Sequence, residues 1–236
     1  MALKILQNKI EILQARQKLL AKRVSFIDLP VHCLLRKLKL KPGMAIGGRV
    51  KSWDVLSVID FLDSHVQKNE PILDIGCYAS ETIVALHKLG YSNLTGVDLN
   101  SNLLKMPYRN FIHYEIGDFM HTKFDDGAFR AITSISVIEH GFNGPLLLKE
   151  VSRLLNKGGY FIATFDYWPE KIDTKGVKLF GLDWQIFSRD EIKDLIIKAG
   201  CYGLVPSGKM LYEAKDAPID WQGKKYTFAW LALRKV

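Results

Sequence analysis

Segments with strand-like and helix-like patterns alternate along the chain between about residues 52 and 166. Short apolar runs such as PILDIG and NLTGVDL are typical of buried strands, and amphipathic runs such as WDVLSVIDFLDSHV and SETIVALHKLG separate them. Units of this length predict parallel strands joined by right-handed crossovers, with helices on both faces of one sheet. We therefore expect an α/β fold with a doubly wound, mostly parallel seven-stranded sheet of the Rossmann-like type.

The last two strand-like segments, YGLVPSGKM and YTFAWLALRK, have no helix between them, which predicts one antiparallel strand near the edge of this sheet. The length of 236 residues, 48% of them apolar, suits one such domain with an appendage. No run approaches the roughly 18 to 20 apolar residues of a membrane span, and the start of the chain lacks the pattern of a secretory signal. The three cysteines are scattered, so we expect a cytoplasmic protein without disulfides or a metal site.

The basic charge of the chain is concentrated at its N-terminal end. Residues 1–51 contain twelve Lys and Arg against two acidic residues, a net charge of +10, whereas the whole chain has +8. Apolar positions repeat there at helical spacing, which predicts a helix over residues 2–23; the stripe consists of Leu3, Leu6, Ile10, Leu13, Gln17, Leu20 and Val24. Such a helix can pack on the core, lie on an anionic membrane surface, or pair with its twin in a dimer.

The stretch GCYASE, residues 76–81, follows the first strand at the sheet edge where doubly wound folds bind ligands. A dinucleotide site needs G-x-G-x-x-G, so that backbone amides can approach a pyrophosphate. Here Tyr78 stands at the second glycine position and Glu81 at the third, which puts a side chain and a negative charge where the phosphates would lie. The loop therefore favours a cofactor that has no phosphates and carries a positive centre.

Five motifs between residues 71 and 166 then fall in a characteristic order: LDIGCYAS, GVDLN, YEIGDF, FDDGAFRAITSISVIEH and EVSRLLNKGGYFIATF. Together they resemble the successive motifs of class I S-adenosylmethionine-dependent methyltransferases. The resemblance implies S-adenosylmethionine as the cofactor. The end of the basic stretch and the glycines at 47 and 48 predict a boundary there, with a basic helical extension over residues 1–48 and a catalytic domain over residues 49–236. Tyr78 and Ser80 depart from the family pattern, which usually has glycine at both positions.

By position in these motifs, the resemblance implies that ten residues hold the cofactor: Asp74, Gly76, Cys77, Tyr78, Asp98, Leu99, Asp118, Phe119, Ser136 and Val137. Asp98 would accept hydrogen bonds from the ribose hydroxyls, and Asp118 would bond the exocyclic amine of the adenine. A single aspartate at a strand end is commonly a cap or turn residue. Aspartates at three successive strand ends, namely Asp74, Asp98 and Asp118, favour a cofactor site.

Methyl transfer requires the donor and acceptor to be held in line, and a hydroxyl acceptor also needs a base. His140, in VIEHG after the fourth strand, would lie beside the methyl group and is the first candidate, although this Glu-His pair also shapes the loop in the family. Asp166, at the end of the fifth strand, is the second candidate. The segment SISV replaces the [DN]-P-P-[YF] motif that nucleic-acid amino methyltransferases carry, so a nucleic-acid base is a disfavoured acceptor.

The insertion over residues 166–188 begins on the same rim and is rich in aromatic and acidic residues. We expect Tyr167, Trp168 and Asp173 to contact the acceptor, through stacking on a sugar ring and hydrogen bonds to hydroxyls. The alternative is a packed lid whose tryptophans belong to the core.

We therefore expect O-methylation of a carbohydrate or a related small molecule, with a peripheral membrane contact or a homodimer through the N-terminal helix. Two alternatives stay open. One is an RNA methyltransferase that tracks phosphates with residues 1–51. The other is a catalytically inactive binding module with the same fold, which Tyr78 and Ser80 suggest.

Overall fold

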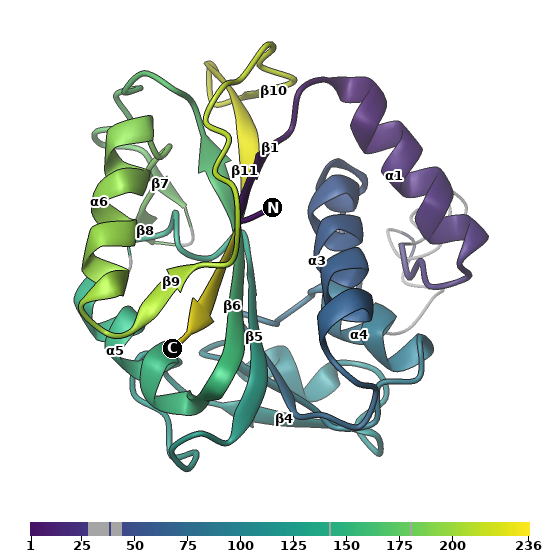
Figure 1. Ribbon diagram of the computed structural model, residues 1–236. Helices are drawn as coiled ribbons and strands as arrows, with labels where there is room; N and C mark the ends of the chain where they lie inside the picture. Colours follow the sequence, from purple (N-terminus) through teal and green to yellow (C-terminus); the bar gives the residue numbers. More distant parts are fainter. Residues whose placement is uncertain (28–37, 39–43, 142, 180) are drawn as a thin grey trace.

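The computed structural model describes residues 1–27, 38, 44–141, 143–179 and 181–236, and most of the basic stretch between residues 28 and 43 lies outside them. At its centre is one mixed sheet with the strand order β1-β11-β6-β5-β2-β3-β4 (Figure 1). The strands of this sheet, including two short ones that pair with β11, are β1 (Leu3–Ile5), β2 (Ile72–Ile75), β3 (Leu94–Asp98), β4 (Ile112–Ile116), β5 (Phe129–Ile135), β6 (Leu155–Tyr167), β9 (Leu204–Pro206), β10 (Ile219–Trp221) and β11 (Lys224–Lys235).

The five strands from β4 to β6 pair in parallel, and β11 runs antiparallel to β6. This confirms the predicted fold class, including the reversed strand near the edge. In the described part of the chain the sheet has nine strands instead of seven, because β1 and β10, which were not predicted from the sequence, also pair with β11. The buried strand β2 is apolar on both faces except for one aspartate, as expected for a strand at the centre of the sheet.

Helices cover both faces of the sheet (Figure 1). One face packs against α1 (Lys9–Ala21), α3 (Ser52–His65) and α4 (Glu81–Lys88), and the other against α5 (Gly144–Leu154) and α6 (Arg189–Gly200). Short 3₁₀ turns, η1 (Arg49–Lys51) and η2 (Ser101–Lys105), complete the list. In the described residues, no helix is both long enough and apolar enough to cross a bilayer.

The predicted N-terminal helix was wrong in extent, and of the three roles left open for its apolar stripe, packing on the core does not hold for Ile10, Leu13 and Leu20. Residues 3–5 form strand β1 rather than the start of a helix, because they pair with β11. The helix that follows, α1, turns Ala15 and Leu19 into the core, while Ile10, Leu13 and Leu20 of the predicted packing stripe are 62%, 64% and 56% exposed. Its buried face is therefore narrow and made of different residues.

The insertion contains a short hairpin of β7 (Lys178–Leu179) and β8 (Leu182–Asp183). Its return segment runs beside the loop after β5: His140 forms an antiparallel bridge with Trp184, and the Gln185 amide donates to the Glu139 carbonyl at 2.9 Å. The insertion thus positions the Glu-His loop at the rim of the sheet.

Candidate active site

The loop after β2 turns sharply because of one glycine. Gly76 has a φ of +66°, in the left-handed region that glycine tolerates, and a Cβ there would lie 2.4 Å from Cγ2 of Val137. The Ser80 amide then donates to the Cys77 carbonyl at 2.9 Å, and the Ser80 hydroxyl caps α4 by accepting from the Thr82 amide. The loop and the first turn of α4 therefore lie against the end of β5.

The Asp98 carboxylate, at the end of β3, is held by two backbone amides. Its Oδ2 accepts from the Tyr78 amide at 2.9 Å, and its Oδ1 accepts from the Asn100 amide at 2.8 Å. Each carboxylate oxygen has a second lone pair that can accept a further hydrogen bond. A ribose contact by Asp98 stays a prediction, and this geometry is compatible with it.

A cavity of about 710 Å³ opens on this loop, a volume typical of small-molecule sites. We call it the first cavity. It brings together eight of the residues predicted from the sequence: Gly76, Tyr78, Asp98, Leu99, Phe119, Ser136, Val137 and His140. Tyr78 therefore takes part in the wall of the cavity although it replaces a glycine of the family pattern.

Three predicted cofactor residues do not line this cavity. Asp74 is buried in β2, where its Oδ1 accepts from the Thr133 hydroxyl at 2.6 Å, and burial raises its pKa to about 7 despite that bond. Cys77 is fully buried, and a Cβ added at Gly96 would lie 2.5 Å from the Cys77 Sγ atom. Asp118 accepts from an amide two residues further on. All three support the loops that form the wall.

Residues from the N-terminal side of the chain complete the first cavity, and the sequence did not predict them. Gly47, Gly48 and Lys51 line it, and the Gly47 amide donates to the Ala79 carbonyl at 2.8 Å. The adjacent glycines at 47 and 48 were a signal in the sequence for this close contact with the cavity, but such a pair is equally typical of a domain boundary. Glu81, which we return to below, also lines the cavity.

A second cavity of about 550 Å³ shares Lys51, Ser136 and His140 with the first. Its other walls combine aromatic and acidic side chains, including Glu139, Asp166, Asp220, Trp221, Tyr226 and Phe228. The two cavities therefore meet at a lysine, a serine and a histidine. A donor in one and an acceptor in the other would face each other there.

A half-buried lysine lies among the carboxyl groups between the cavities. Lys51 Nζ lies 3.6 Å from Asp166 Oδ1 and 3.5 Å from the centre of the Phe228 ring. Burial by itself would lower the pKa of Lys51, but the nearby carboxyl groups, chiefly Asp166 and Asp54, outweigh it and raise that pKa. Burial raises the pKa of Asp54 to about 6, and burial together with Asp166 raises the pKa of Glu139 well above its usual range. Lys51 therefore keeps its positive charge beside two carboxyl groups, Asp54 and Glu139, whose pKa values are raised.

His140 has the protonation state that a base requires. Burial, reinforced by the charge of Lys51 and opposed by Asp166, lowers its pKa, so the imidazole is neutral at pH 7. The Trp184 indole donates to Asp166 Oδ2 at 2.8 Å and is itself buried, so the insertion fixes both predicted catalytic residues. His140 and Asp166 both line the second cavity.

The predicted acceptor residues lie elsewhere. Tyr167 is buried and donates its hydroxyl to the Tyr212 carbonyl at 2.6 Å. Trp168 is half-buried against the core, and Asp173 is an exposed turn residue that accepts from the Lys175 amide. None of these three residues forms part of the wall of either cavity. The aromatic wall comes instead from β10 and β11, which are far from the insertion in sequence: Trp221, Tyr226 and Phe228.

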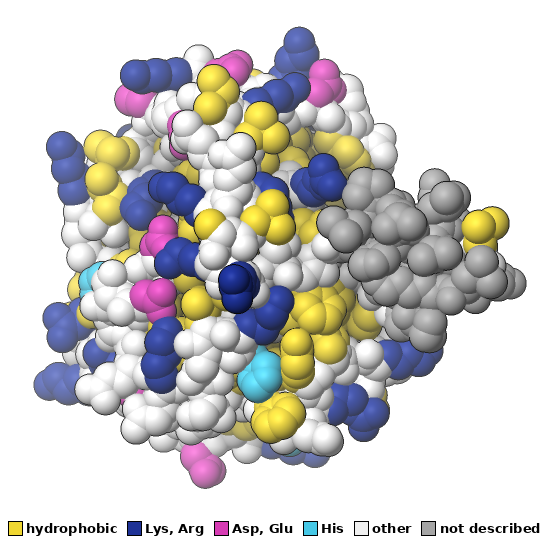
Figure 2. Space-filling view, turned by 90° about the vertical axis from the view of Figure 1, so that its right-hand side faces the viewer, with side chains coloured by type: hydrophobic (Ala, Val, Ile, Leu, Met, Phe, Trp, Pro, Cys, Tyr) yellow, Lys and Arg dark blue, Asp and Glu magenta, His cyan; other side chains and the backbone are white. Residues whose placement is uncertain are grey.

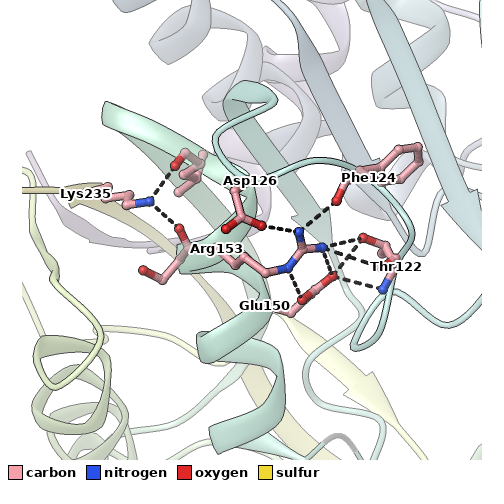
Figure 3. A network of polar contacts seen from close by, with 8 residues as sticks. Thr122, Phe124, Asp126, Glu150, Arg153 and Lys235 are labelled. Carbon is pink, nitrogen blue, oxygen red and sulfur yellow. Dashed lines mark hydrogen bonds and ion pairs between the residues drawn. The ribbon is translucent and has the colours of Figure 1, made fainter.

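The loop over residues 119–127, whose Phe119 lines the first cavity, is tied to α5 by an ion-pair network (Figure 3). Arg153 donates to both carboxylate oxygens of Glu150, at 2.7 and 2.9 Å. The amide and hydroxyl of Thr122 donate to the same carboxylate, at 2.9 and 2.7 Å. Burial would raise the pKa of Glu150, but these hydrogen bonds lower it to about 2. The network therefore fixes one wall of the cavity.

Comparison with known proteins is consistent with this geometry. Residues 73–163 match the family model described as a methyltransferase domain. Over 108 residues the chain is 30% identical to the demethylmenaquinone methyltransferase of Staphylococcus haemolyticus, covering 43% of this chain and 45% of that one. Over 134 residues it is 26% identical to the eEF1A lysine and N-terminal methyltransferase of Xenopus laevis, covering 50% and 19%. The chain thus spans less than half the length of these curated relatives.

Solved structures share the fold. A geranyl diphosphate C-methyltransferase from Streptomyces coelicolor A3(2), in complex with Mg2+, geranyl diphosphate and S-adenosyl-L-homocysteine, superposes with a TM-score of 0.55 at 18% identity, over 76% of this chain and 77% of that one. The [4+2]-cyclase SpnF superposes with a TM-score of 0.58 at 14% identity, over 87% and 93%. The cyclase demonstrates that this fold serves more than one reaction, so the reaction must be argued from the site.

The predicted family and cofactor are confirmed at the level of the family, which uses S-adenosylmethionine. A second geranyl diphosphate methyltransferase structure contains S-adenosylmethionine itself. The first cavity of the present chain suits such a cofactor, because it offers a carboxylate at the end of β3 and a glycine turn after β2. Residues 73–163 of this chain therefore match the methyltransferase domain family, in agreement with the family predicted from the sequence.

Proposed function

We propose that this protein transfers a methyl group from S-adenosylmethionine to a hydroxyl group of a carbohydrate or a related small molecule. One observation carries the proposal: the two cavities meet at Lys51, Ser136 and His140. This arrangement leaves room for the cofactor in the first cavity and for the acceptor in the second. A methyl group can then pass between them without either molecule leaving its pocket.

The residues at the junction have complementary tasks. When bound, S-adenosylmethionine supplies an electrophilic methyl group on a sulfonium. His140 would take the proton of the acceptor hydroxyl as the oxygen bonds to the methyl carbon and the bond from that carbon to sulfur breaks, which leaves S-adenosylhomocysteine; His140 would then release the proton to solvent. The Lys51 ammonium stabilises negative charge on the acceptor oxygen during this step. Asp166 holds Lys51 in place and accepts a hydrogen bond from the acceptor.

The walls of the second cavity support a polyhydroxylated acceptor. Trp221 is 37% exposed and offers an aromatic face on which the apolar side of a sugar ring can stack, and the buried rings of Tyr226 and Phe228 line the same wall. Asp166 and Asp220 offer oxygens that accept hydrogen bonds from hydroxyl groups. In this proposal the contacts with the acceptor come from these residues, and not from Tyr167, Trp168 and Asp173 of the insertion.

Calorimetric titration with S-adenosylmethionine and S-adenosylhomocysteine is the first test. Micromolar binding of both, followed by methylation of a sugar or polyol in a mass-spectrometric acceptor screen, would support the proposal. Absence of binding to either molecule would favour the inactive binding module. Transfer to amines but not to hydroxyls would contradict the acceptor class.

We also propose that the outer face of α1 contacts an anionic membrane surface. Ile10, Leu13 and Leu20 are exposed on this face, and α1 belongs to the strongly basic N-terminal part of the chain. Figure 2 presents this side of the molecule, where hydrophobic side chains lie among Lys and Arg. Co-sedimentation with vesicles of anionic lipid, lost in Leu13→Glu and with neutral lipid, would support the contact. If light scattering shows a dimer that Leu13→Glu dissociates, and the protein does not bind vesicles, this face is a dimer contact and not a membrane contact.

A cytoplasmic location is part of the same proposal. Cys77 and Cys201 are both free thiols, as is usual in a reducing compartment. Cell fractionation checks the location.

A further inference from the structure

Glu81 is the residue that puts a negative charge where a nucleotide loop has its third glycine. It is the first residue of α4, is 2% exposed, and lines the first cavity. A buried carboxylate in this position is unfavourable unless a cation and further donors compensate for its lost hydration. The cation comes from the N-terminal segment, from a helix 65 residues away in the sequence.

Arg16 of α1 binds Glu81 with both ends of its guanidinium. Nη1 donates to Oε1 at 2.9 Å and Nη2 donates to Oε2 at 2.8 Å. Its two remaining contacts reach other elements: Nη1 donates to the Ser25 hydroxyl at 2.7 Å and Nε donates to the Ser52 hydroxyl at 2.9 Å. The Phe26 amide also donates to Glu81 Oε1, at 2.8 Å. One arginine thus joins α1, the segment after it and the start of α3 to the cofactor loop.

A second contact between the N-terminal segment and the loop lies beside the first. Gly47 has a φ of +70°, and a Cβ there would lie 2.8 Å from Cβ of Glu81. Its amide donates to the Ala79 carbonyl. The backbone of residues 47–48 therefore packs directly on the loop and forms part of the cavity wall.

We propose that Arg16 is a positioning residue of the cofactor site. By neutralising Glu81, Arg16 holds the N-terminal segment against the cofactor loop, and we call this contact the latch. Docking of the segment and binding of the cofactor are therefore coupled. The proposal rests on cofactor binding in the first cavity, which belongs to the proposed function. Coupling of this kind is reciprocal, so the cofactor stabilises docking of α1 by the same factor by which docking strengthens cofactor binding.

Removing Arg16 has a definite physical consequence. Among the described residues, the Glu81 carboxylate then keeps the Ser25 hydroxyl and the Phe26 amide as donors, which do not replace a bidentate cation. It can regain hydration by turning into the first cavity, or by releasing the segment that contains Gly47. Either change alters the wall that the cofactor contacts.

The test is the affinity of the full-length protein for S-adenosylhomocysteine, measured by calorimetry at a temperature where circular dichroism reports every variant folded. Arg16→Met should weaken binding by about tenfold or more, within the usual range of coupling factors. Arg16→Lys, which keeps the charge but loses the bidentate geometry, should fall between Arg16→Met and the wild type. Adding Glu81→Gln to Arg16→Met should restore part of the affinity, because no buried charge is then left uncompensated.

Lys18→Met is the matched control, since Lys18 is exposed on the same helix. Hydrogen exchange supplies the second readout: S-adenosylhomocysteine should slow exchange of the α1 amides in the wild type and in Lys18→Met, but not in Arg16→Met. Unchanged affinity in Arg16→Met, with only a lower melting temperature, would overturn the latch alone and leave Arg16 a stabiliser of the fold. Failure of the wild type to bind S-adenosylhomocysteine would overturn both the latch and the proposed function.

Discussion

Replacing Asp98 by Asn separates the two tasks of this carboxylate. In the wild type both oxygens accept backbone amides, from Tyr78 and Asn100, and both remain available to ribose hydroxyls. Asn has one acceptor oxygen and one NH2, so one amide then faces a donor and one hydroxyl loses its acceptor. A hydrogen bond to a charged group contributes about 1.5–3 kcal/mol. At about 1.4 kcal/mol per tenfold, Asp98→Asn should weaken S-adenosylhomocysteine binding by roughly 10- to 150-fold.

Calorimetry on Asp98→Asn measures this loss, with Asp125→Asn in an exposed loop as the control for a changed net charge. An analogue that lacks the ribose 2′-hydroxyl should lose less affinity on the variant than S-adenosylhomocysteine does, because part of the contact is already missing. An affinity within about threefold of the wild type would refute a ribose contact by Asp98, since a charged hydrogen bond contributes more than that. Equal losses for both ligands would point to the Tyr78 amide, and thus to the loop, as the whole effect.

Three further changes probe the rest of the site. His140→Gln should lower turnover of an identified acceptor about a hundredfold or more with unchanged S-adenosylhomocysteine affinity. Because the pKa of His140 is lowered, the rate of the wild-type enzyme should rise with pH only below about 6.5 and then level off. A rate that still rises from pH 7 to pH 8 would argue for another base. Gly76→Ala should abolish cofactor binding because of its contact with Val137 and its positive φ, and Val137→Ala should relieve only the contact, leaving about 1–2 kcal/mol of backbone strain visible in urea unfolding. Glu150→Gln should destabilise the fold at pH 7, and the difference in unfolding free energy from the wild type should shrink as pH falls from about 4.3, the unfolded pKa, towards about 2; a constant difference across that range would contradict an ionised Glu150.

The alternation of strand and helix patterns was sufficient to predict the sheet. Strands such as β2 and β5 are buried on both faces, and their apolar runs and the turn residues that bound them are local signals. The positions of Gly76 and Asp98 follow from the same logic, because the carboxyl ends of parallel strands meet at one edge. Their place at one edge of the sheet could therefore be predicted from spacing, whereas their role toward the cofactor is implied by the resemblance to the methyltransferase family.

The N-terminal segment could not be predicted in this way. A stripe of apolar residues predicts a buried face, but β1 pairs with β11 across more than 220 residues, and the helix after it is oriented by that pairing and by Arg16. The three leucine and isoleucine positions of the stripe that belong to α1 ended on the outside. Periodicity reports that a helix has an apolar face; it carries no information on which face the rest of the chain will cover.

The amino-acid sequence alone determined the class of fold, the glycine turn after β2 and the carboxylate at the end of β3. Each of these depends either on neighbours within a few residues or on the regular geometry of a parallel sheet. Only the tertiary structure decided what surrounds them. Lys51, Glu139 and Asp166 come from three distant segments, and the pKa values of Lys51 and Glu139 depend on burial and on the distances between the three groups, which no spacing in the sequence encodes. The same holds for Glu81: in the sequence it is a charge in the wrong place, and in the fold Arg16 neutralises it.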